Sequence, residues 1–331
     1  MNPPKVNDQD YINFLIATPK VCTGTEAARV QPLDGPVPAH DAFTRLLHRL
    51  EPDAATLWQE AAGQIERDRG ILVVDDSTLD KPYAKKIDLV QRHWSGKHQA
   101  VVEGINLITL LWSAGDRHVP MDYRLYDKAG DQLTKNDHFQ ALLTTAHDRG
   151  FMPECVVFDS WYSSLANLKR VAGWGWVWLT RLKANRLVNP DRSGLRPVAR
   201  VDTDARGVIV HLKGYGFIRL FKIVALNGDI DWWASNDLNM SSLMRVRWAG
   251  YAWTIEHDHR GIKQFCGVER AHVRAARAQR NHIGLCLRAF LRLECYCYHA
   301  GISWFEAKTA IIRPAVRAYL ANPLYTLPAT A

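Results

Sequence analysis

The sequence contains no apolar stretch long enough to cross a membrane. Its most apolar windows, residues 104–112 and 171–180, are strand-length and fall short of the roughly 18 to 20 apolar residues that a membrane helix needs. The opening residues, MNPPKVNDQDY, lack the basic start and the apolar run of a secretion signal. These absences argue against a membrane or secreted protein and predict a cytoplasmic one.

Cysteine pairs of the metal-binding kind are also absent. The chain has six cysteines, and none of them forms a CxxC pair. Cys295 and Cys297 stand too close together for the usual spacing of zinc ligands. Because unpaired cysteine is among the most buried residue types, we expect reduced and mostly buried thiols.

Repeats and low-complexity tracts are missing as well, whereas positive charge is plentiful and unevenly placed. The 331 residues allow one large domain plus one or two small ones. Of the net charge of +8, residues 271–320 carry +6, from eight Lys or Arg and two acids. A basic segment on a nearly neutral body fits a polyanion partner, because neutralised phosphates release counterions. A solvated helix face explains the same charges equally well.

The first sixty residues predict short helices joined by tight turns. Apolar residues at helical spacing indicate a helix over residues 11–18. Thr23 would cap a second helix, and Asp41 would cap a third over residues 42–50. This pattern fits a helix-turn-helix unit, and on spacing alone it fits a plain packing domain as well. We expect an N-terminal helical, helix-turn-helix-like DNA-binding domain over residues 1–68.

From residue 70 the pattern changes to buried strands. Strands are predicted over residues 71–74, 101–113, 119–126, 155–158 and 176–182, with helices over residues 136–149 and 165–172. The order strand, strand, strand, helix, strand, helix, strand predicts an α/β protein with an RNase H-like mixed sheet flanked by helices. In that fold the first and fourth strands are neighbours, so Asp76 and Asp159 would stand side by side at the C-terminal ends of their strands.

A second β-rich stretch follows this core. Its strands predict a β-rich insertion at about residues 190–240, before a long helix over residues 243–265 that holds Glu256. We therefore expect an α/β domain over residues 69–270 that contains the insertion. A basic helical C-terminal segment would cover residues 271–331.

Three motifs carry a family resemblance. ILVVDDSTLDKP contains Asp76, CVVFDSWYSS contains Asp159, and WTIEHDHRGIKQFCGVER contains Glu256. The acids are separated by 83 and 97 residues, and the second interval holds the insertion. With these motifs the chain resembles, over roughly residues 8–300, the DDE transposases of bacterial insertion sequences. It is similar to the subgroup whose RNase H-like domain is interrupted by β-strands.

The third motif departs from the family pattern at two positions. Many relatives carry Tyr-x2-Arg-x3-Glu-x6-Lys around the glutamate, whereas this chain has Ala249 and Ala252 in place of the Tyr and the Arg. Arg245, Arg247 and Tyr251 are close by in the sequence and are candidates to substitute for them.

The resemblance implies a DNA transposase, a metal-dependent endonuclease and strand transferase that cleaves the ends of a mobile element and joins them to target DNA. The implied catalytic residues are Asp76, Asp159 and Glu256, which would hold two Mg²⁺ or Mn²⁺ ions with Asp76 bridging both. The implied partner is double-stranded DNA, namely the terminal inverted repeats of the element and the target, and a dimer would bind it.

Two alternatives concern the metal site. Asp75 is the main rival of Asp76, because side chains alternate along a strand and only one of the two faces the metals. The family pattern places the acid directly before a Ser or Thr, which favours Asp76. His257 and His259 lie near Glu256, but helix residues two apart do not face each other, so a zinc site is disfavoured.

Further side chains are candidates for binding DNA. We expect phosphate contacts from seven cations, with solvated side chains as the alternative: Lys263, Arg270, Arg274, Arg277, Lys85, Lys86 and Arg92. Trp161, Trp232 or Trp233 would stack on an unpaired base near a DNA end, with core packing as the alternative.

Two other functions fit the same motifs. One is a repair or recombination nuclease on the RNase H-like fold, and the other is a catalytically silent, transposase-derived DNA-binding regulator. The helical N-terminus and the β insertion favour the transposase over the nuclease, and the three acids argue against the silent regulator.

Overall fold

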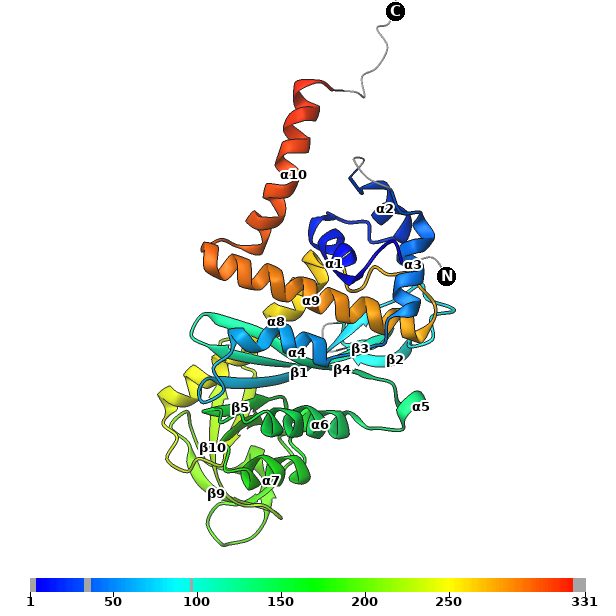
Figure 1. The fold of residues 1–331 in the computed structure, drawn as a ribbon. Coiled ribbons are helices and arrows are strands. Elements are labelled where there is room, and N and C mark those ends of the chain that lie inside the picture. Colours follow the sequence, from blue (N-terminus) through cyan, green and yellow to red (C-terminus); the bar gives the residue numbers. More distant parts are fainter. Residues whose placement is uncertain (1–3, 33–36, 96–97, 324–331) are drawn as a thin grey trace, which may run out of the picture. The chain divides into compact units, whose positions relative to one another are not determined.

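A computed structural model of the chain describes residues 4–32, 37–95 and 98–323. The last residues of the expected C-terminal segment, 324–331, lie outside this part. The chain forms two compact units (Figure 1). Unit 1 comprises Met1–Asp53, Ala84–Asp88 and Arg260–Ala331, and unit 2 comprises Ala54–Tyr83 and Leu89–His259. In the described ranges, no helix is both long enough and apolar enough to span a membrane.

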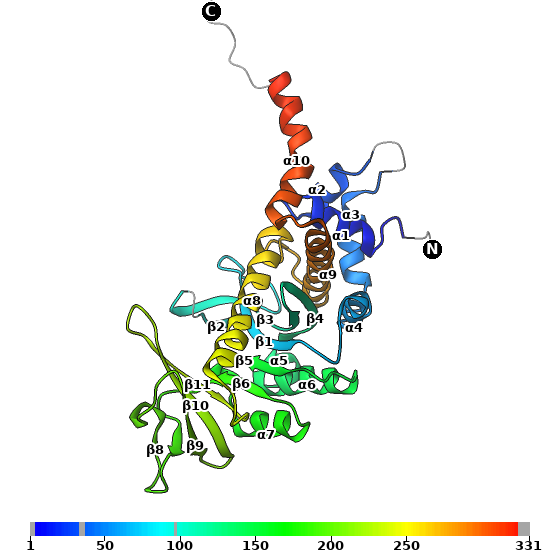
Figure 2. The ribbon, with the colours of Figure 1, turned by 90° about the vertical axis from the view of Figure 1, so that its left-hand side faces the viewer.

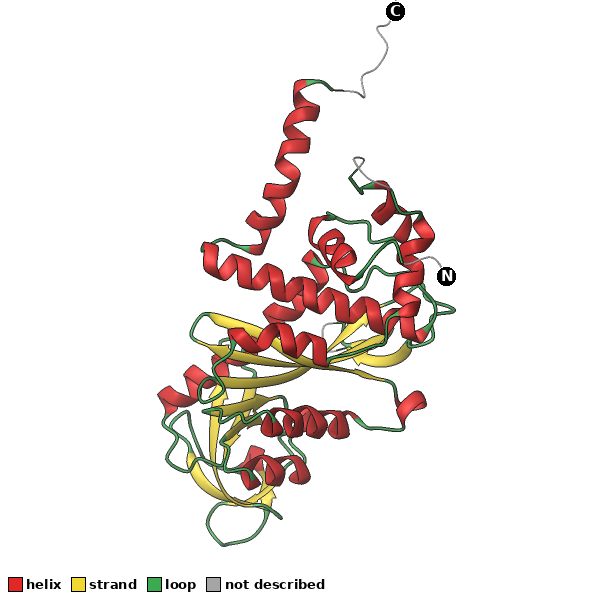
Figure 3. Ribbon diagram, viewed as in Figure 1, coloured by secondary structure: helices red, strands yellow, loops and turns green. Residues whose placement is uncertain are grey.

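Unit 2 is built on a mixed sheet (Figure 3), which has eleven strands within the described residues. The strands are β1 (Ile71–Asp80), β2 (Gln91–Ser95), β3 (Ala100–Ala114), β4 (Arg117–Tyr126), β5 (Cys155–Phe158), β6 (Trp178–Arg181), β7 (Leu187–Asn189), β8 (Arg196–Pro197), β9 (Val208–Leu212), β10 (Gly216–Val224) and β11 (Ile230–Ser235). Their order across the sheet is β2-β3-β1-β5-β6-β11-β10-β9-β7-β8, and β4 pairs with β3.

The helices divide between the two units. Those of unit 2 are α4 (Ala55–Ala61), α5 (Lys128–Asp131), α6 (Lys135–Asp148) and α7 (Leu165–Gly173), with the short turns η1 (Ala62–Gln64), η2 (Ser160–Tyr162) and η3 (Val198–Arg200). Those of unit 1 are α1 (Asp8–Ala17), α2 (Gly24–Arg29), α3 (His40–Arg49), α9 (Ala276–Ala300) and α10 (Trp304–Ala321). The long helix α8 (Ser242–Phe265) begins in unit 2 and ends in unit 1.

The fold class expected from the sequence is confirmed. β1 lies between β3, to which it runs antiparallel, and β5, to which it runs parallel, and β5 in turn pairs parallel with β6. The first and the fourth expected strands, now β1 and β5, are therefore neighbours. This mixed sheet, flanked by helices and widened by a β insertion, has the RNase H-like arrangement.

Two details of the strand prediction were wrong. β1 runs ten residues to Asp80, so Asp75 and Asp76 lie within the strand and not at its end. The reason is that β3 is long and pairs with every residue of β1, whereas β5 pairs only with residues 71–74. Between β1 and β3, where no strand was predicted, the structure has a further strand, β2, which pairs with the start of β3.

The β insertion continues the main sheet. β11 pairs antiparallel with β6, and β10 and β9 follow outward from it (Figure 2). β7 pairs with β9 further out. The insertion therefore widens the sheet beside the two short parallel strands, and it shares their core.

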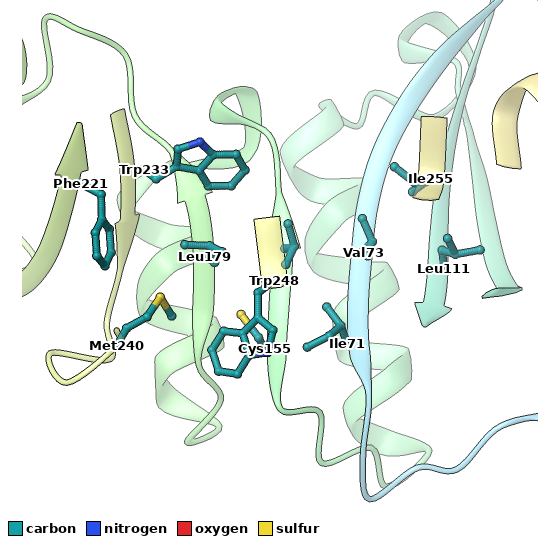
Figure 4. Packing of buried hydrophobic residues seen from close by; sticks show 11 residues of the cluster. Ile71, Val73, Leu111, Cys155, Leu179, Phe221, Trp233, Met240, Trp248 and Ile255 are labelled. Atoms are coloured by element: carbon teal, nitrogen blue, oxygen red, sulfur yellow. The ribbon is translucent and has the colours of Figure 1, made fainter. Parts of the chain in front are cut away.

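The core on one face of the sheet lies under α8 (Figure 4). Trp248 and Ile255 of α8 pack with Val73 of β1, Val157 of β5 and Leu179 of β6. On the other face α6 covers the same strands, where the rings of Phe139 and Phe158 lie 5.0 Å apart. Each central strand thus has one row of side chains toward α8 and one toward α6.

Unit 1 is a helical unit in which the N-terminal helices pack on α9. Asn281 of α9, which is buried, donates to the carbonyls of Leu47 and Leu50 at the end of α3. Lys308 of α10 is also buried and donates to the carbonyls of Leu15 and Thr18 at the end of α1. The N-terminal helices and the C-terminal segment, which the sequence analysis treated as separate, thus share one unit.

The first helix caps agree only in part with the prediction. Thr23 caps α2 as expected, through a hydrogen bond from the backbone N–H of Glu26. The prediction that Asp41 caps α3 was wrong, because the helix begins one residue earlier, at His40, with Ala39 as its cap. Asp41 instead lies in the first turn and pairs with Arg45.

Candidate active site

Asp75 and Asp76 point to opposite faces of the sheet. Val73 belongs to the core under α8, and strand alternation puts Asp75 on that same face. Asp75 is in register with Thr109 of β3, whose hydroxyl lies 2.7 Å from Nε2 of His259 on α8. Asp76 faces the side of the sheet that α6 covers.

Asp76 is held by three hydrogen-bond donors on its own face. Nζ of Lys135 and Nδ2 of Asn106 lie 2.8 and 2.7 Å from Oδ2, and the hydroxyl of Tyr162 lies 2.8 Å from Oδ1. Burial works to raise the pKa of Asp76, but the charge of Lys135 and the three hydrogen bonds hold it below its usual value. Asp76 is thus an ionised carboxylate whose oxygens already have protein partners.

Asp159 follows the last residue of β5 and shares the face of Asp75. Val157 packs in the core under α8 and is in register with Val73, and both acids lie two residues further along their parallel strands. They are therefore adjacent positions on one face of the sheet. Oδ1 of Asp159 lies 3.2 Å from Nη2 of Arg181, at the end of β6.

Glu256 stands on α8, the helix that covers this face. It is exposed and directly follows the buried Ile255. Contacts to β3 hold the helix on both sides of it, since Thr254 lies 3.4 Å from the hydroxyl of Ser113 and His259 lies 2.7 Å from that of Thr109. His259 is thus buried and engaged by a strand hydroxyl.

The electrostatics of Asp75 link these acids. Burial raises the pKa of Asp75 well above its usual value, and the negative charges of Asp76, Asp159 and Glu256 raise it further. These three carboxylates are therefore close enough to Asp75 to oppose its ionisation. We call Asp75, Asp159 and Glu256, the three that lie on the α8 side, the acid face.

All three donors of the acid face are carboxylates, which are the ligands that hard divalent cations prefer. A bound cation would also offset the cost of ionising Asp75. Among the residues that the structure describes, no three His, Cys, Asp or Glu side chains already form a metal-binding group. Arg181 supplies positive charge beside Asp159 instead. To hold a metal, Asp159 would exchange this guanidinium for the cation.

Three of the expected phosphate-binding side chains hold other parts of unit 1. Lys263 pairs with Glu269 at 3.2 Å, Arg270 donates to the carbonyl of Lys20 at 2.6 Å, and Arg277 donates to the carbonyl of Leu50 at 3.0 Å. Arg277 is exposed nevertheless, as are the other four, Arg274, Lys85, Lys86 and Arg92. The first three have structural partners that spacing along a helix does not reveal.

The candidates to replace the missing Tyr and Arg of the third motif lie away from the acid face. Arg245 is buried. Arg247 and Tyr251 line a cavity of about 260 Å³ beside Ile71, the first residue of β1. The hydroxyl of Tyr251 accepts a hydrogen bond from the backbone N–H of Gly115 at 3.2 Å. The acids lie at the other end of the paired segment of β1.

Sequence reasoning missed the cations that neighbour the acids. Arg181 ends the buried strand β6, and a charged residue at such a position was a signal available in the sequence. Lys135 lies in the first turn of α6, where a lysine opposes the helix dipole and so needs a partner such as Asp76. Neither residue belongs to the three motifs.

An RNase H-like sheet that brings carboxylates from β1, β5 and a covering helix to one face defines a class of phosphoryl-transfer nuclease domains. The chain belongs to a family of this class, the DDE superfamily endonucleases, whose sequence profile matches residues 39–207. The matched stretch, just over half of the chain, includes Asp75, Asp76 and Asp159 and ends before Glu256.

One solved structure that resembles the chain is the Drosophila P element transposase strand transfer complex. The likeness has a TM-score of 0.29 and 13% sequence identity over 53% of this chain. It spans 37% of the length of that transposase chain, and it is too weak to place residues. Among curated proteins, none matches the chain.

Proposed function

We propose that the chain is a DNA transposase of the insertion-sequence kind, which cleaves the ends of a mobile element and joins them to target DNA. Membership of the DDE superfamily endonucleases supports the reaction class. The observation that carries the proposal is the placement of Asp75 and Asp159 at adjacent positions of two parallel strands, beneath the helix that bears Glu256.

The proposed ligands of the divalent cations, Mg²⁺ or Mn²⁺, are Asp159, Glu256 and one acid of β1. The family pattern favours Asp76 for the third position. The register of the sheet favours Asp75, because it shares a face with Asp159 and Glu256, whereas Asp76 is engaged by Lys135 on the other face. We therefore take Asp75 as the acid of β1 that faces the metals.

Two bound cations would supply the activation of the attacking oxygen and the stabilisation of the leaving oxygen in an in-line displacement at phosphorus. The chain's own residues hold the donors in place. The contacts of α8 with Ser113 and Thr109 fix the helix turns around Glu256. Arg181 is positioned to balance the charge of Asp159 before a cation binds, and afterwards it is close enough to meet a DNA phosphate.

DNA would be held by exposed cations on both units. Arg274, Lys85 and Lys86 of unit 1 and Arg92 of unit 2 are exposed, as phosphate contacts require. Phosphate contacts carry no sequence information, so the N-terminal helices are the proposed reader of the terminal repeats. A dimer is proposed in the DNA complex, because transposition coordinates two ends.

A repair nuclease and a silent regulator are the competing functions. A repair nuclease would need no separate unit to recognise its own ends, and the helices α1–α3 supply a candidate for one. A silent regulator would have no use for Asp75, because burial and the neighbouring carboxylates oppose its ionisation, and this costs stability unless a cation binds there.

The test uses the inverted repeats that flank the gene as a labelled DNA duplex, with the full chain and Mn²⁺ or Mg²⁺. We expect cleavage at the repeat ends and joining to a target plasmid. Asp159→Asn and Glu256→Gln should abolish both reactions and keep end binding. Asp229→Asn, an exposed acid of the β10–β11 turn, is the matched control and should retain activity. Cleavage without end preference would identify a nuclease, and binding without cleavage a regulator.

A further inference from the structure

Of the three tryptophans that the sequence offered for base stacking, one is available in the structure. Trp232 and Trp233 are 5% and 8% exposed and pack in the sheet, whereas Trp161 is 56% exposed. Trp161 lies in η2, two residues after Asp159. An aromatic ring two residues from Asp159 is therefore open to solvent.

Two lysines flank the ring of Trp161. Nζ of Lys183 lies 5.5 Å and Nζ of Lys135 lies 5.7 Å from the ring centroid. Both distances are near the outer limit of a cation–π contact. More than half of the surface of Trp161 remains exposed with the two lysines in place.

Buried contacts hold Trp161 and Lys135 in position. Lys135 is anchored by its ion pair with Asp76, whose other oxygen accepts the hydroxyl of Tyr162. Tyr162, the residue after Trp161, is buried and stacks on Phe139 of α6 with ring centroids 5.1 Å apart and planes 15° apart. The ring and one of its lysines are thus held by the same buried cluster, and this gives Asp76 a role on its own face of the sheet.

We propose that Trp161 and Lys183 form a binding site for an unpaired nucleotide of a DNA strand, with Lys135 as the residue that supports the ring. The base would stack on the indole, and the exposed ammonium group of Lys183 would bind a neighbouring phosphate, whereas that of Lys135 stays paired with Asp76. A base inside a duplex has both faces covered by its neighbours, so the site takes a nucleotide only where the strands are separated. The choice of DNA rests on the proposed function, but the binding itself requires neither cleavage nor a metal.

The test measures binding of the full chain, in EDTA, to labelled (dT)12 and to a blunt duplex of the same length. Trp161→Ala should weaken binding of (dT)12 about tenfold or more, in line with base–aromatic stacking in other proteins, and leave the duplex unaffected. Trp161→Phe keeps an aromatic face and should retain most of the affinity. Phe305→Ala, which removes a 65% exposed ring of α10, is the matched control and should change neither affinity.

The contribution of Lys183 is tested by the salt dependence of (dT)12 binding. Lys183→Met should lower the slope of log affinity against log salt by about 0.7, the value for one phosphate contact on a single strand. A second readout is a 2-aminopurine placed in the oligonucleotide, whose fluorescence should be quenched by the wild type and not by Trp161→Ala.

The proposal is overturned if the wild type does not bind (dT)12, or if Trp161→Ala weakens the duplex as much as the single strand. Its failure can be told apart from failure of the proposed function, because the assay contains no metal and no cleavage. A chain that cleaves ends but shows no effect of Trp161→Ala refutes the nucleotide-binding site alone. A chain that never cleaves but loses (dT)12 binding with Trp161→Ala refutes the transposase alone.

Discussion

Two neighbouring aspartates of β1 have opposite electrostatic situations. The pKa of Asp75 is raised by burial and by the surrounding carboxylates, whereas that of Asp76 is lowered by Lys135 and its other donors. Adjacent residues differ in this way because alternate side chains of a strand face different layers of the protein. Each residue therefore has its own signature in a stability measurement.

The first prediction uses thermal unfolding near pH 7 without divalent ions. Asp75→Asn should raise the unfolding temperature, because it removes a carboxylate that is costly to ionise in the folded state. Asp76→Asn should lower stability by about 1–3 kcal/mol, because it weakens charged hydrogen bonds to Lys135 and Tyr162. Added Mn²⁺ should stabilise the wild type and Asp76→Asn but not Asp75→Asn. Equal responses of the two variants to Mn²⁺ would contradict the assignment of faces.

The second prediction concerns Glu294 of α9. Burial raises its pKa from the ordinary 4.5, although a hydrogen bond from the indole of Trp304 works against the shift. The folded state then binds the proton more tightly than the unfolded state, so stability falls as pH rises from about 4.5 through the raised value. Glu294→Gln lacks this loss, and its unfolding temperature should gain on the wild type between pH 5 and pH 8. A difference that is constant over this pH range would refute the argument.

At the residue scale, the sequence predicted the types of side chain at the candidate site better than it predicted the face of the sheet to which each side chain points. Asp159 and Glu256 could be named because each follows or lies on a recognisable apolar element. The choice between Asp75 and Asp76 depends on which face α8 covers, and that is decided by Trp248 and Ile255, some 170 to 180 residues further along the chain. No local pattern contains this information.

Helix α9 shows that a local sequence pattern also fails to reveal which partners the side chains of a whole element have. Its arginines have the spacing of a phosphate-binding face, yet Arg277 donates to the carbonyl of Leu50 and pairs with Glu51, and Arg288 pairs with Asp8 at 2.7 Å. These arginines donate a hydrogen bond to the backbone at the end of α3 and form ion pairs with acids of the N-terminal segment. A basic helical stripe can thus be an internal docking face, and composition does not distinguish the two uses.

The third prediction separates these uses with two neighbouring arginines. Arg274 is exposed, so Arg274→Ala should weaken binding of specific and random DNA alike and lower the log–log salt slope by about 0.9. Arg277→Ala should instead lower the stability of unit 1 by about 1 kcal/mol, through the lost hydrogen bond to Leu50. Affinity by anisotropy and stability by denaturant unfolding check both variants. If Arg277→Ala loses affinity at unchanged stability, the arginine contacts DNA after all.

At the scale of elements, the length of β1 was predicted wrongly and β2 was not predicted. The apolar run ILVV correctly located the part of β1 that lies beside β5, because only that part is buried on both faces. The continuation to Asp80 is polar and is held by pairing with β3, which hydrophobicity alone does not predict. Hydrophobicity alone did not predict the short strand β2 either, because every second residue of its sequence, QRHWS, is exposed.

At the scale of the whole molecule, distant segments build both units. β1 and β5 are separated by more than seventy residues, and α8 by a further eighty or more, yet their side chains share one core. The order of elements predicted this RNase H-like sheet correctly. It did not predict that the N-terminal helices and α9 would share a unit, because that packing joins the two ends of the chain.

This organisation affects how the recognition of DNA ends should be tested. Deleting the N-terminal helices would uncover the buried side of α9, including Asn281 and its partners. Loss of end preference in such a truncation would then have two explanations. Substitutions of exposed residues on α2 and α3, such as Arg29 and Arg45, keep the unit intact and isolate the reading of DNA.

The central claim is that cleavage depends on the carboxylates that face α8. The most direct measurement is the rate of Mg²⁺-dependent cleavage of end-containing DNA by Asp75→Asn and Asp76→Asn, side by side at equal occupancy of the DNA. We predict that Asp75→Asn cuts at least a thousandfold more slowly than the wild type, as loss of a residue essential to the reaction implies. Asp76→Asn should retain measurable cleavage. An inactive Asp76→Asn together with a fully active Asp75→Asn would contradict the account.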